Sequence, residues 1–272
     1  MLNKKFYDKK IVFIGSGNMA EAIISGLVKY DIVKSSNIIC NDIAQERLNY
    51  MAQKYIVSVS CDKEEILENA DIVFMAIKPQ HFKSVIEEYG NHIAKAKLVV
   101  TIAAGISTEF VEKYLSKESV VIRVMPNTPA LVGKGAIAVC GGKNATKENI
   151  KDIADLFSVI GKVVVVKENL INAITAVSGS GPAYVFYFSE VMREAAEKLG
   201  IPADIAKDLV SQTIYGSGKM LIESGLDDTV LRKNVTSPGG TTEKAMEEFI
   251  NSDFKQITCT AIEKAKKRTE EL

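Results

Sequence analysis

The stretch Ile11-Val12-Phe13-Ile14-Gly15-Ser16-Gly17-Asn18-Met19-Ala20 decides the fold of this chain. It joins a hydrophobic, β-branched run to a Gly-x-Gly-x-x-Ala pattern that opens a helix, which is a dinucleotide-binding fingerprint. Gly15 permits the tight turn, Gly17 lets the backbone approach a pyrophosphate, and Ala20 lets the helix pack closely on the strand. The free amides and positive dipole end of the helix favour phosphate. We therefore expect a nucleotide to bind here; a purely structural glycine turn is the alternative.

Outward from this stretch, short β-branched runs alternate with helical patterns as far as residue 166. The predicted strands are 10–14, 37–41, 57–59, 71–77, 98–102, 120–124, 136–140 and 162–166. Between them, apolar residues recur at helical spacing in 19–30, 82–89 and 147–160. Such alternation gives a mostly parallel sheet covered by helices on both faces. The sequence predicts an α/β fold in which residues 1–166 form a Rossmann-like dinucleotide-binding domain.

The strand pattern stops after Val166, and the rest of the chain is predicted to be helical. Helical patterns occupy 182–199, 202–224, 242–251 and 253–271, so residues 167–272 are expected to form an all-α domain. The helix 182–199 begins with Ala183-Tyr184-Val185-Phe186-Tyr187-Phe188, which is apolar on every side. Such a helix must be buried on every side, and a few helices alone make a thin core. We expect this domain to pack against a second copy of itself; a helix well buried within one chain is the alternative.

The composition is that of a globular protein, with 47% hydrophobic and 25% charged residues among 272. A formal net charge of zero supplies no field that favours nucleic acid or an anionic membrane. The apolar runs are too short to span a bilayer, and residues 1–10 lack the pattern of a signal or transit peptide. Scattered cysteines are typical of a cytoplasmic protein with reduced thiols. The two histidines, His81 and His92, lie near no second strong ligand, so no metal site is expected.

Further candidate cofactor residues lie where predicted strands end, because open α/β sheets bind ligands at the carboxyl ends of their strands. Asp42, 25 residues after Gly17, suits the ribose hydroxyls of NADH and would repel the 2′-phosphate of NADPH. Arg47, one helical turn onward, would offset that repulsion, so both nucleotides stay open. A helix N-cap is the alternative for Asp42. The other candidates follow the next two strands: Ala76, Ile77, Lys78 (or an ordinary surface lysine) and Pro79, then Ala103 and Ala104.

Three more segments are dense in glycine, proline and hydroxyl residues. They are Arg123-Val124-Met125-Pro126-Asn127-Thr128-Pro129-Ala130, Ala176-Val177-Ser178-Gly179-Ser180-Gly181-Pro182-Ala183-Tyr184 and Val235-Thr236-Ser237-Pro238-Gly239-Gly240-Thr241-Thr242. Together with the fingerprint loop, and in this order, they closely resemble the pyrroline-5-carboxylate reductases over essentially the whole chain. The resemblance implies a Rossmann-like N-terminal domain followed by an all-α dimerisation domain. It also implies NADPH- or NADH-dependent reduction of the cyclic imino acid 1-pyrroline-5-carboxylate to L-proline, the last step of proline biosynthesis.

The resemblance also implies an assembly and a set of site residues. Family members form homodimers, in some cases rings of dimers, and the cofactor of one subunit meets the helical domain of its partner. Asn127 is carried over as a cofactor contact and Thr242 as the catalytic threonine that hydrogen-bonds the ring nitrogen of the substrate. The implied substrate contacts are Glu168, Asn234, Ser237, Gly239, Gly240, Thr241 and Thr242.

The residues of the Ser237–Thr242 segment suit a small carboxylate independently of the resemblance. Two glycines leave backbone N–H groups unobstructed at a predicted helix N-terminus, where an anion is favoured. For Thr241 or Thr242 the alternative is an ordinary N-cap, and for Glu168 it is an exposed loop acid.

The sequence also bears on other functions. A β-hydroxyacid dehydrogenase would place a lysine early in the long helix, and the stretch 184–189 has none. A reductase of a related cyclic imine stays open. A non-catalytic NAD(P)-binding regulator is disfavoured by the intact Ser-Pro-Gly-Gly-Thr-Thr segment.

Overall fold

The computed structural model describes residues 4–93 and 98–272. The chain divides into two compact units. One consists of Met1–Ser180 together with Ala265–Leu272, and the other of Gly181–Lys264. The second unit is therefore inserted, in sequence, between two segments of the first.

The first unit is built on one eight-stranded sheet with the order β3-β2-β1-β4-β5-β6-β7-β8. Every neighbouring pair is parallel except β6 and β7, which are antiparallel. The prediction of a mostly parallel sheet is confirmed, and each predicted strand is present with its ends shifted by at most two residues. The strands are β1 (Ile11–Ile14), β2 (Ile38–Asn41), β3 (Ser58–Val59), β4 (Ile72–Met75), β5 (Leu98–Thr101), β6 (Val121–Met125), β7 (Gly135–Gly141) and β8 (Gly161–Val165).

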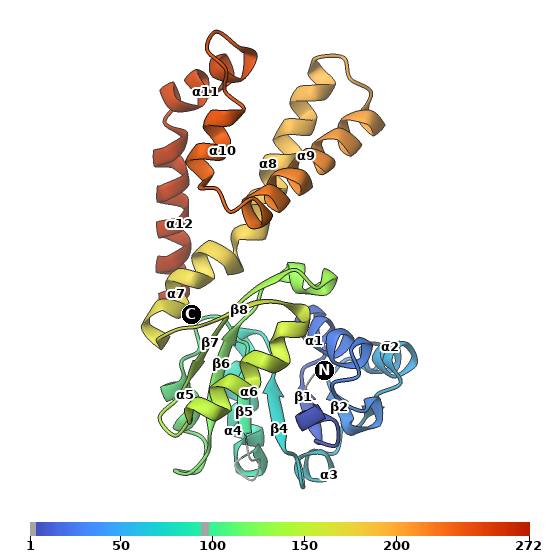
Figure 1. Ribbon diagram of the computed structural model, residues 1–272. Helices are drawn as coiled ribbons and strands as arrows, with labels where there is room; N and C mark the ends of the chain where they lie inside the picture. The colour runs from blue at the N-terminus through green and yellow to red at the C-terminus, as the bar shows by residue number, and fades with distance from the viewer. Residues whose placement is uncertain (1–3, 94–97) are drawn as a thin grey trace. The chain divides into compact units, whose positions relative to one another are not determined.

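Helices cover this sheet and bury its central strands (Figure 1). Alternate residues of β1 enter two separate cores: Phe13 packs with Phe74 and Phe157, while Val12 packs with Phe82 and its neighbours. The rings of Phe13 and Phe74 stack with their centroids 4.6 Å apart. Both faces of the sheet are therefore covered, as a parallel sheet requires. The helices are α1 (Asn18–Lys29), α2 (Gln45–Tyr55), α3 (Lys63–Leu67), α4 (Pro79–Ile93), α5 (Thr108–Glu112), α6 (Lys147–Phe157) and α7 (Ile171–Ile174).

The second unit is entirely helical. Gly200 adopts φ of +90° after the first helix, and Pro202 precedes the second, so the predicted break between them is confirmed. A short helix, α10, was not predicted; it begins after Asp227, whose carboxylate accepts a hydrogen bond from the Thr229 amide. The helices are α8 (Gly181–Lys198), α9 (Ala203–Glu223), α10 (Asp228–Asn234), α11 (Thr241–Asn251) and α12 (Phe254–Glu270), of which the last ends in the first unit.

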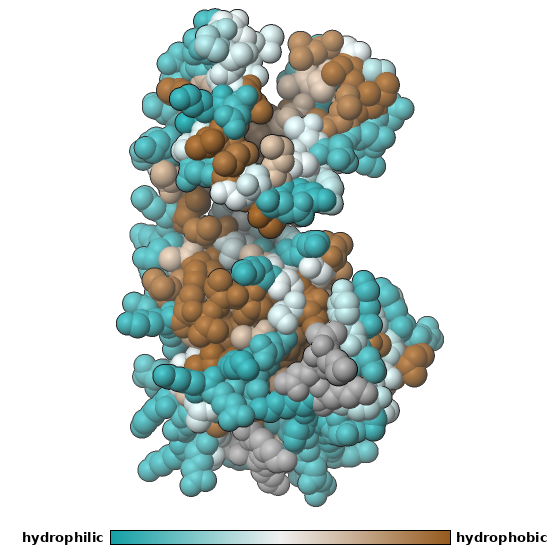
Figure 2. Space-filling view, in the orientation of Figure 1, coloured by the Kyte–Doolittle hydropathy of each residue, from teal (hydrophilic) through white to brown (hydrophobic). Residues whose placement is uncertain are grey.

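The helical unit exposes large apolar side chains on several of its helices (Figure 2). All of its residues, 181–264, are described, and only Ala206 and Val210 are buried. On α8, Phe186 is 65% and Tyr187 67% exposed. The alternative of an α8 well buried within one chain is therefore wrong. A protein surface with this much exposed apolar area is typical of an interface.

Candidate functional site

The turn between β1 and α1 has the geometry that a pyrophosphate needs. Gly15 adopts φ of +92°, and a Cβ there would lie 2.5 Å from the carbonyl oxygen of Ala76, so no other residue fits. Gly17 is the N-cap of α1, without a side-chain cap, and a Cβ there would meet nothing within 4 Å. The first amides of α1 therefore face open space at the positive end of the helix dipole. These residues fit the phosphates of a dinucleotide.

The predicted cofactor residues gather at one edge of the sheet. The parallel strands β2, β1, β4 and β5 are neighbours, so the loops that follow them share one edge. Ile14, Ser16 and Ala20 are buried within the first loop and its helix, Asn18 is exposed, and Met19 is half-buried. After β4, Ala76, Ile77 and Pro79 are half-buried and Lys78 is exposed; after β5, Ala103 is buried and Ala104 half-buried.

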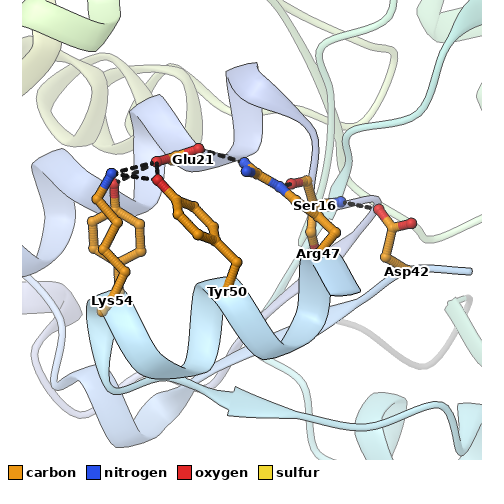
Figure 3. Close-up of polar contacts among 7 residues, drawn as sticks. Ser16, Glu21, Asp42, Arg47, Tyr50 and Lys54 are labelled. Carbon is orange, nitrogen blue, oxygen red and sulfur yellow. Dashed lines mark hydrogen bonds and ion pairs between the residues drawn. The ribbon is translucent and has the colours of Figure 1, made fainter. Parts of the chain in front are cut away.

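Asp42 follows β2 and is bound to the fingerprint loop (Figure 3). Its Oδ2 accepts a hydrogen bond from the Ser16 amide at 2.7 Å, and its Oδ1 accepts one from the Ala44 amide at 3.0 Å. The N-cap of α2 is Ala44. The alternative of Asp42 as a helix N-cap is therefore wrong.

Arg47 lies against the same loop but is paired with a carboxylate of α1. Its Nε donates to the Ser16 carbonyl and its Nη2 to Glu21 Oε2, both at 2.5 Å (Figure 3). Only 24% of the Arg47 side chain and 11% of the Glu21 side chain are exposed.

Glu21 was not among the predicted site residues. Burial would raise the pKa of its carboxyl, but hydrogen bonds from Arg47, Lys54, Tyr50 and Tyr55 together lower that pKa to about 2. Three of these donors, Arg47, Tyr50 and Lys54, are spaced by three and four residues, so they share one face of α2. That spacing is the feature of the sequence from which the cluster could have been found.

Asn127 has both ends of its side-chain amide bound within the chain. Its Nδ2 donates to the Ser178 carbonyl and its Oδ1 accepts from the Ala136 amide, each at 2.9 Å, and the residue is buried. The side chain thus joins the loop after β6 to the start of β7 and to the π-helical turn Thr175–Gly179. Its contact with a cofactor stays a prediction.

Glu168 belongs to a buried polar network in the first unit. Its two carboxylate oxygens accept hydrogen bonds from the Thr108 amide at 2.7 Å and the Thr108 hydroxyl at 2.6 Å. Arg123, whose side chain is 4% exposed, pairs with Glu168 at 3.3 Å and donates to Asn172 at 3.0 Å. The alternative of an exposed loop acid is wrong, because this carboxylate is bound by three donor groups of Thr108 and Arg123 and its side chain is 28% exposed.

The Ser237–Thr242 segment forms the turn between α10 and α11 in the helical unit. Asn234 ends α10, Gly239 adopts φ of +71°, and Gly240 is the N-cap of α11. Neither Thr241 nor Thr242 is the N-cap, so that alternative is wrong. Thr242 is half-buried, and its hydroxyl forms no hydrogen bond within the described chain.

One expectation about this turn is corrected by the structure. The two glycines were expected to leave the backbone N–H groups around them unobstructed. Instead, the Gly239 amide donates to Glu243 Oε2 at 2.8 Å, and the Gly240 amide donates to the Ser237 carbonyl at 3.0 Å. An internal carboxylate therefore already occupies part of the place predicted for a substrate carboxylate. The first amides of α11 have no side-chain cap.

Other kinds of site are not evident in the described residues. No group of three or more histidine, cysteine, aspartate or glutamate side chains there could hold a metal ion. Nor does any helix of the described chain combine the length and hydrophobicity needed to cross a membrane. Each of the four cysteines is free.

Comparison with protein families gives one match in each half of the chain. Residues 168–272 match the family described as pyrroline-5-carboxylate reductase dimerisation. Residues 10–105 match the family described as NADP oxidoreductase, coenzyme F420-dependent.

Similar whole proteins are found among curated sequences and solved structures. Pyrroline-5-carboxylate reductase 2 of Bacillus subtilis is 38% identical over 265 residues, which is 97% of this chain and 95% of the relative. The Methanosarcina acetivorans enzyme is 37% identical over 265 residues, covering 97% and 98%. A pyrroline-5-carboxylate reductase structure from Coxiella burnetii has 35% identity and a TM-score of 0.88 over 97% of this chain and 98% of that one. The Plasmodium falciparum structure with NADP bound has 30% identity and a TM-score of 0.88, covering 98% of each chain.

Proposed function

The chain belongs to the pyrroline-5-carboxylate reductase family, and from this premise we propose that it reduces 1-pyrroline-5-carboxylate to L-proline with NADH or NADPH. The observation that carries the proposal is the match to the Bacillus subtilis reductase along 97% of this chain. The first unit supplies what such a reaction needs from a dinucleotide site, since the uncapped end of α1 and the open surface at Gly17 suit the phosphates. A reduced nicotinamide bound there would supply the hydride for the C=N carbon.

We propose that the Thr242 hydroxyl forms a hydrogen bond with the ring nitrogen of the imine. Its hydroxyl is half-buried, lies at the N-terminus of α11, and has no partner in the described chain that would compete for it. A hydroxyl in that position can orient the nitrogen and pass a proton to it. A protonated imine is already electrophilic, so orientation is the larger part of what the protein contributes. Asn234, Ser237, Gly239, Gly240, Thr241 and Glu168 are proposed as the other substrate contacts.

The test is an assay of the purified chain with reduced nicotinamide and 1-pyrroline-5-carboxylate, followed at the nicotinamide absorbance. Thr242→Ala is expected to lower turnover at least about tenfold, the usual scale of a lost catalytic hydrogen bond. Thr242→Ser, which keeps the hydroxyl, is the matched control and should retain most of the activity. Nicotinamide oxidation that ignores the imine would reject the proposed function. Equal turnover in the wild type and Thr242→Ala would contradict the catalytic role of Thr242 but not the proposed function.

Self-association follows from the dimerisation family that residues 168–272 match. We propose that the basic assembly is a homodimer; larger rings of dimers stay a prediction. The exposed apolar side chains of α8 and α9 support an assembly that covers them. Free cysteines support a cytoplasmic location, and balanced charge supports a protein that binds neither nucleic acid nor membrane.

A further inference from the structure

Two side chains of opposite charge lie beside the fingerprint loop, where the adenine ribose of a dinucleotide is recognised. NADPH differs from NADH by a phosphate on that ribose, which carries nearly two negative charges at neutral pH. An acid after the second strand suits the ribose hydroxyls, whereas an arginine nearby suits the phosphate. The nucleotide preference therefore depends on which of Asp42 and Arg47 has its charge available.

The carboxylate of Asp42 is fixed in place but not neutralised. It accepts hydrogen bonds from the backbone amides of Ser16 and Ala44, at 2.7 and 3.0 Å. No ion pair to Asp42 is formed within the described part of the chain, and the side chain is partly exposed. Since Ser16 lies between Gly15 and Gly17, this negative charge is held directly against the nucleotide loop.

The charge of Arg47, by contrast, is compensated. Its guanidinium donates to the Ser16 carbonyl and to the Glu21 carboxylate and lies 4.9 Å from the ring centroid of Tyr50. Glu21 is itself held in place by the hydroxyls of Tyr50 and Tyr55. The arginine would have to leave an ion pair that is mostly shielded from water in order to reach a phosphate.

We propose that Glu21 holds Arg47 against the loop, so that Asp42 alone acts at the ribose and this chain prefers NADH to NADPH. Glu21 is then a positioning residue that sets nucleotide specificity through Arg47. The proposal rests on the proposed function for the use of a reduced nicotinamide. The preference is proposed for this chain and not for its relatives; the Plasmodium falciparum structure, for example, has NADP bound.

Calorimetric titration of the whole chain with NAD⁺ and with NADP⁺ tests the preference without any substrate. The Kd for NAD⁺ is expected to be at least about tenfold lower than that for NADP⁺, because the unpaired Asp42 carboxylate beside the loop opposes the phosphate. Asp42→Ser should reduce the ratio of the two Kd values at least about tenfold. Asp155→Asn removes an exposed charge on α6 that pairs with Lys151, and as the control it should leave the ratio unchanged.

Two further variants test the role of Glu21. Glu21→Gln should tighten NADP⁺ binding by roughly three- to tenfold, because Arg47 loses its counter-charge, and leave NAD⁺ within about twofold. Arg47→Gln should leave the ratio of the two Kd values unchanged. If circular dichroism shows that Glu21→Gln is unfolded, the result for Arg47→Gln tests the proposal in its place.

Tighter binding of NADP⁺ to the wild type, or a selective loss of NADP⁺ binding in Arg47→Gln, would overturn the proposal. A chain that prefers NAD⁺ but does not reduce the imine would contradict the proposed function alone. A chain that reduces the imine with NADPH in preference to NADH would contradict this inference alone.

Discussion

Glu243 lies in the first turn of α11, and its side chain reaches back to the turn between α10 and α11. Its carboxylate accepts a hydrogen bond from the Gly239 amide at 2.8 Å, in the turn assigned to the substrate. A substrate carboxylate arriving there meets like charge and must displace the internal oxygen. If the substrate carboxylate binds in this turn as proposed, Glu243 would compete with it for the Gly239 amide.

We predict that Glu243→Gln lowers the KM for 1-pyrroline-5-carboxylate by roughly three- to tenfold, since a neutral acceptor competes less strongly than a charged one. Steady-state kinetics at saturating nicotinamide measure it. Glu247→Gln is the matched control, because Glu247 lies one turn further along α11 and pairs with Lys244. A higher KM in Glu243→Gln would show that Glu243 assists binding rather than opposing it.

Residues that act through the backbone could be predicted from the sequence, whereas residues that act through distant partners could not. Gly15 and Gly17 follow from local geometry alone, and the structure gives each the conformation or open space expected. Asp42 was identified by its place after a strand, but its contact with Ser16 depends on residues 26 positions apart. Glu21 draws its partners from another helix, so no local pattern in its own helix identifies it. The occupied amide of Gly239 likewise depends on a side-chain conformation.

Among the elements, the segment after β8 is held by a charged pair as well as by the apolar packing of Ile171. Glu168, in the 3₁₀ turn Glu168–Leu170, pairs with Arg123 of β6 and accepts hydrogen bonds from Thr108 at the start of α5. The same arginine donates to Asn172 of α7. The guanidinium thereby connects strand β6 to this turn and to α7, and Glu168 connects the turn to α5.

We predict that Arg123→Met lowers the free energy of unfolding by about 2–4 kcal/mol, because a partly buried carboxylate loses its counter-charge. Urea denaturation measures the change. Lys151→Met removes the lysine of an exposed pair on α6 and should cost less than about 0.5 kcal/mol. Equal effects of the two substitutions would mean that the buried pair contributes no more than a surface one.

Strands and long helices were predicted better than short helices, for a physical reason. Strands buried on both faces appear as unbroken hydrophobic runs, so β1 and β4 are evident in the sequence. Helices such as α3 and α10 have too few turns to show a period, and they depend on caps such as Asp62 and Asp227. The antiparallel pairing of β7 was not predicted, although the nine residues 126–134 are too few for a parallel crossover.

For the whole molecule, the helical unit is incomplete without a partner. A groove in it is lined almost entirely by apolar side chains of α8, α11 and α12, including Tyr187, Phe188, Phe254 and Ile257. Phe188, Phe249 and Phe254 form one aromatic cluster there. With two buried residues of its own, this unit has little core to support it as a monomer.

We predict that Tyr187→Asp shifts the purified chain to a smaller species in sedimentation velocity, with loss of stability, because a charge would be buried at the interface. Ile56→Asp, at a 71% exposed position of the first unit, is the control and should sediment as the wild type does. The thermal midpoint of the wild type should also rise with protein concentration, since association stabilises the folded chain. A midpoint independent of concentration, with unchanged sedimentation of Tyr187→Asp, would contradict an interface at α8.

The last turn of α12 has a consequence for how this protein can be divided. Thr269 and Leu272 lie against Gly105, where a Cβ would be 2.6 Å from the Leu272 side chain, so they form part of the first unit. A nucleotide-binding half cut away from the helices that follow it would lose this segment and uncover the loop after β5. Because the first unit consists of two segments of the sequence, a single crossover does not exchange either unit intact. Swapping the helical unit with that of another protein requires two junctions, one near residue 180 and one near residue 265.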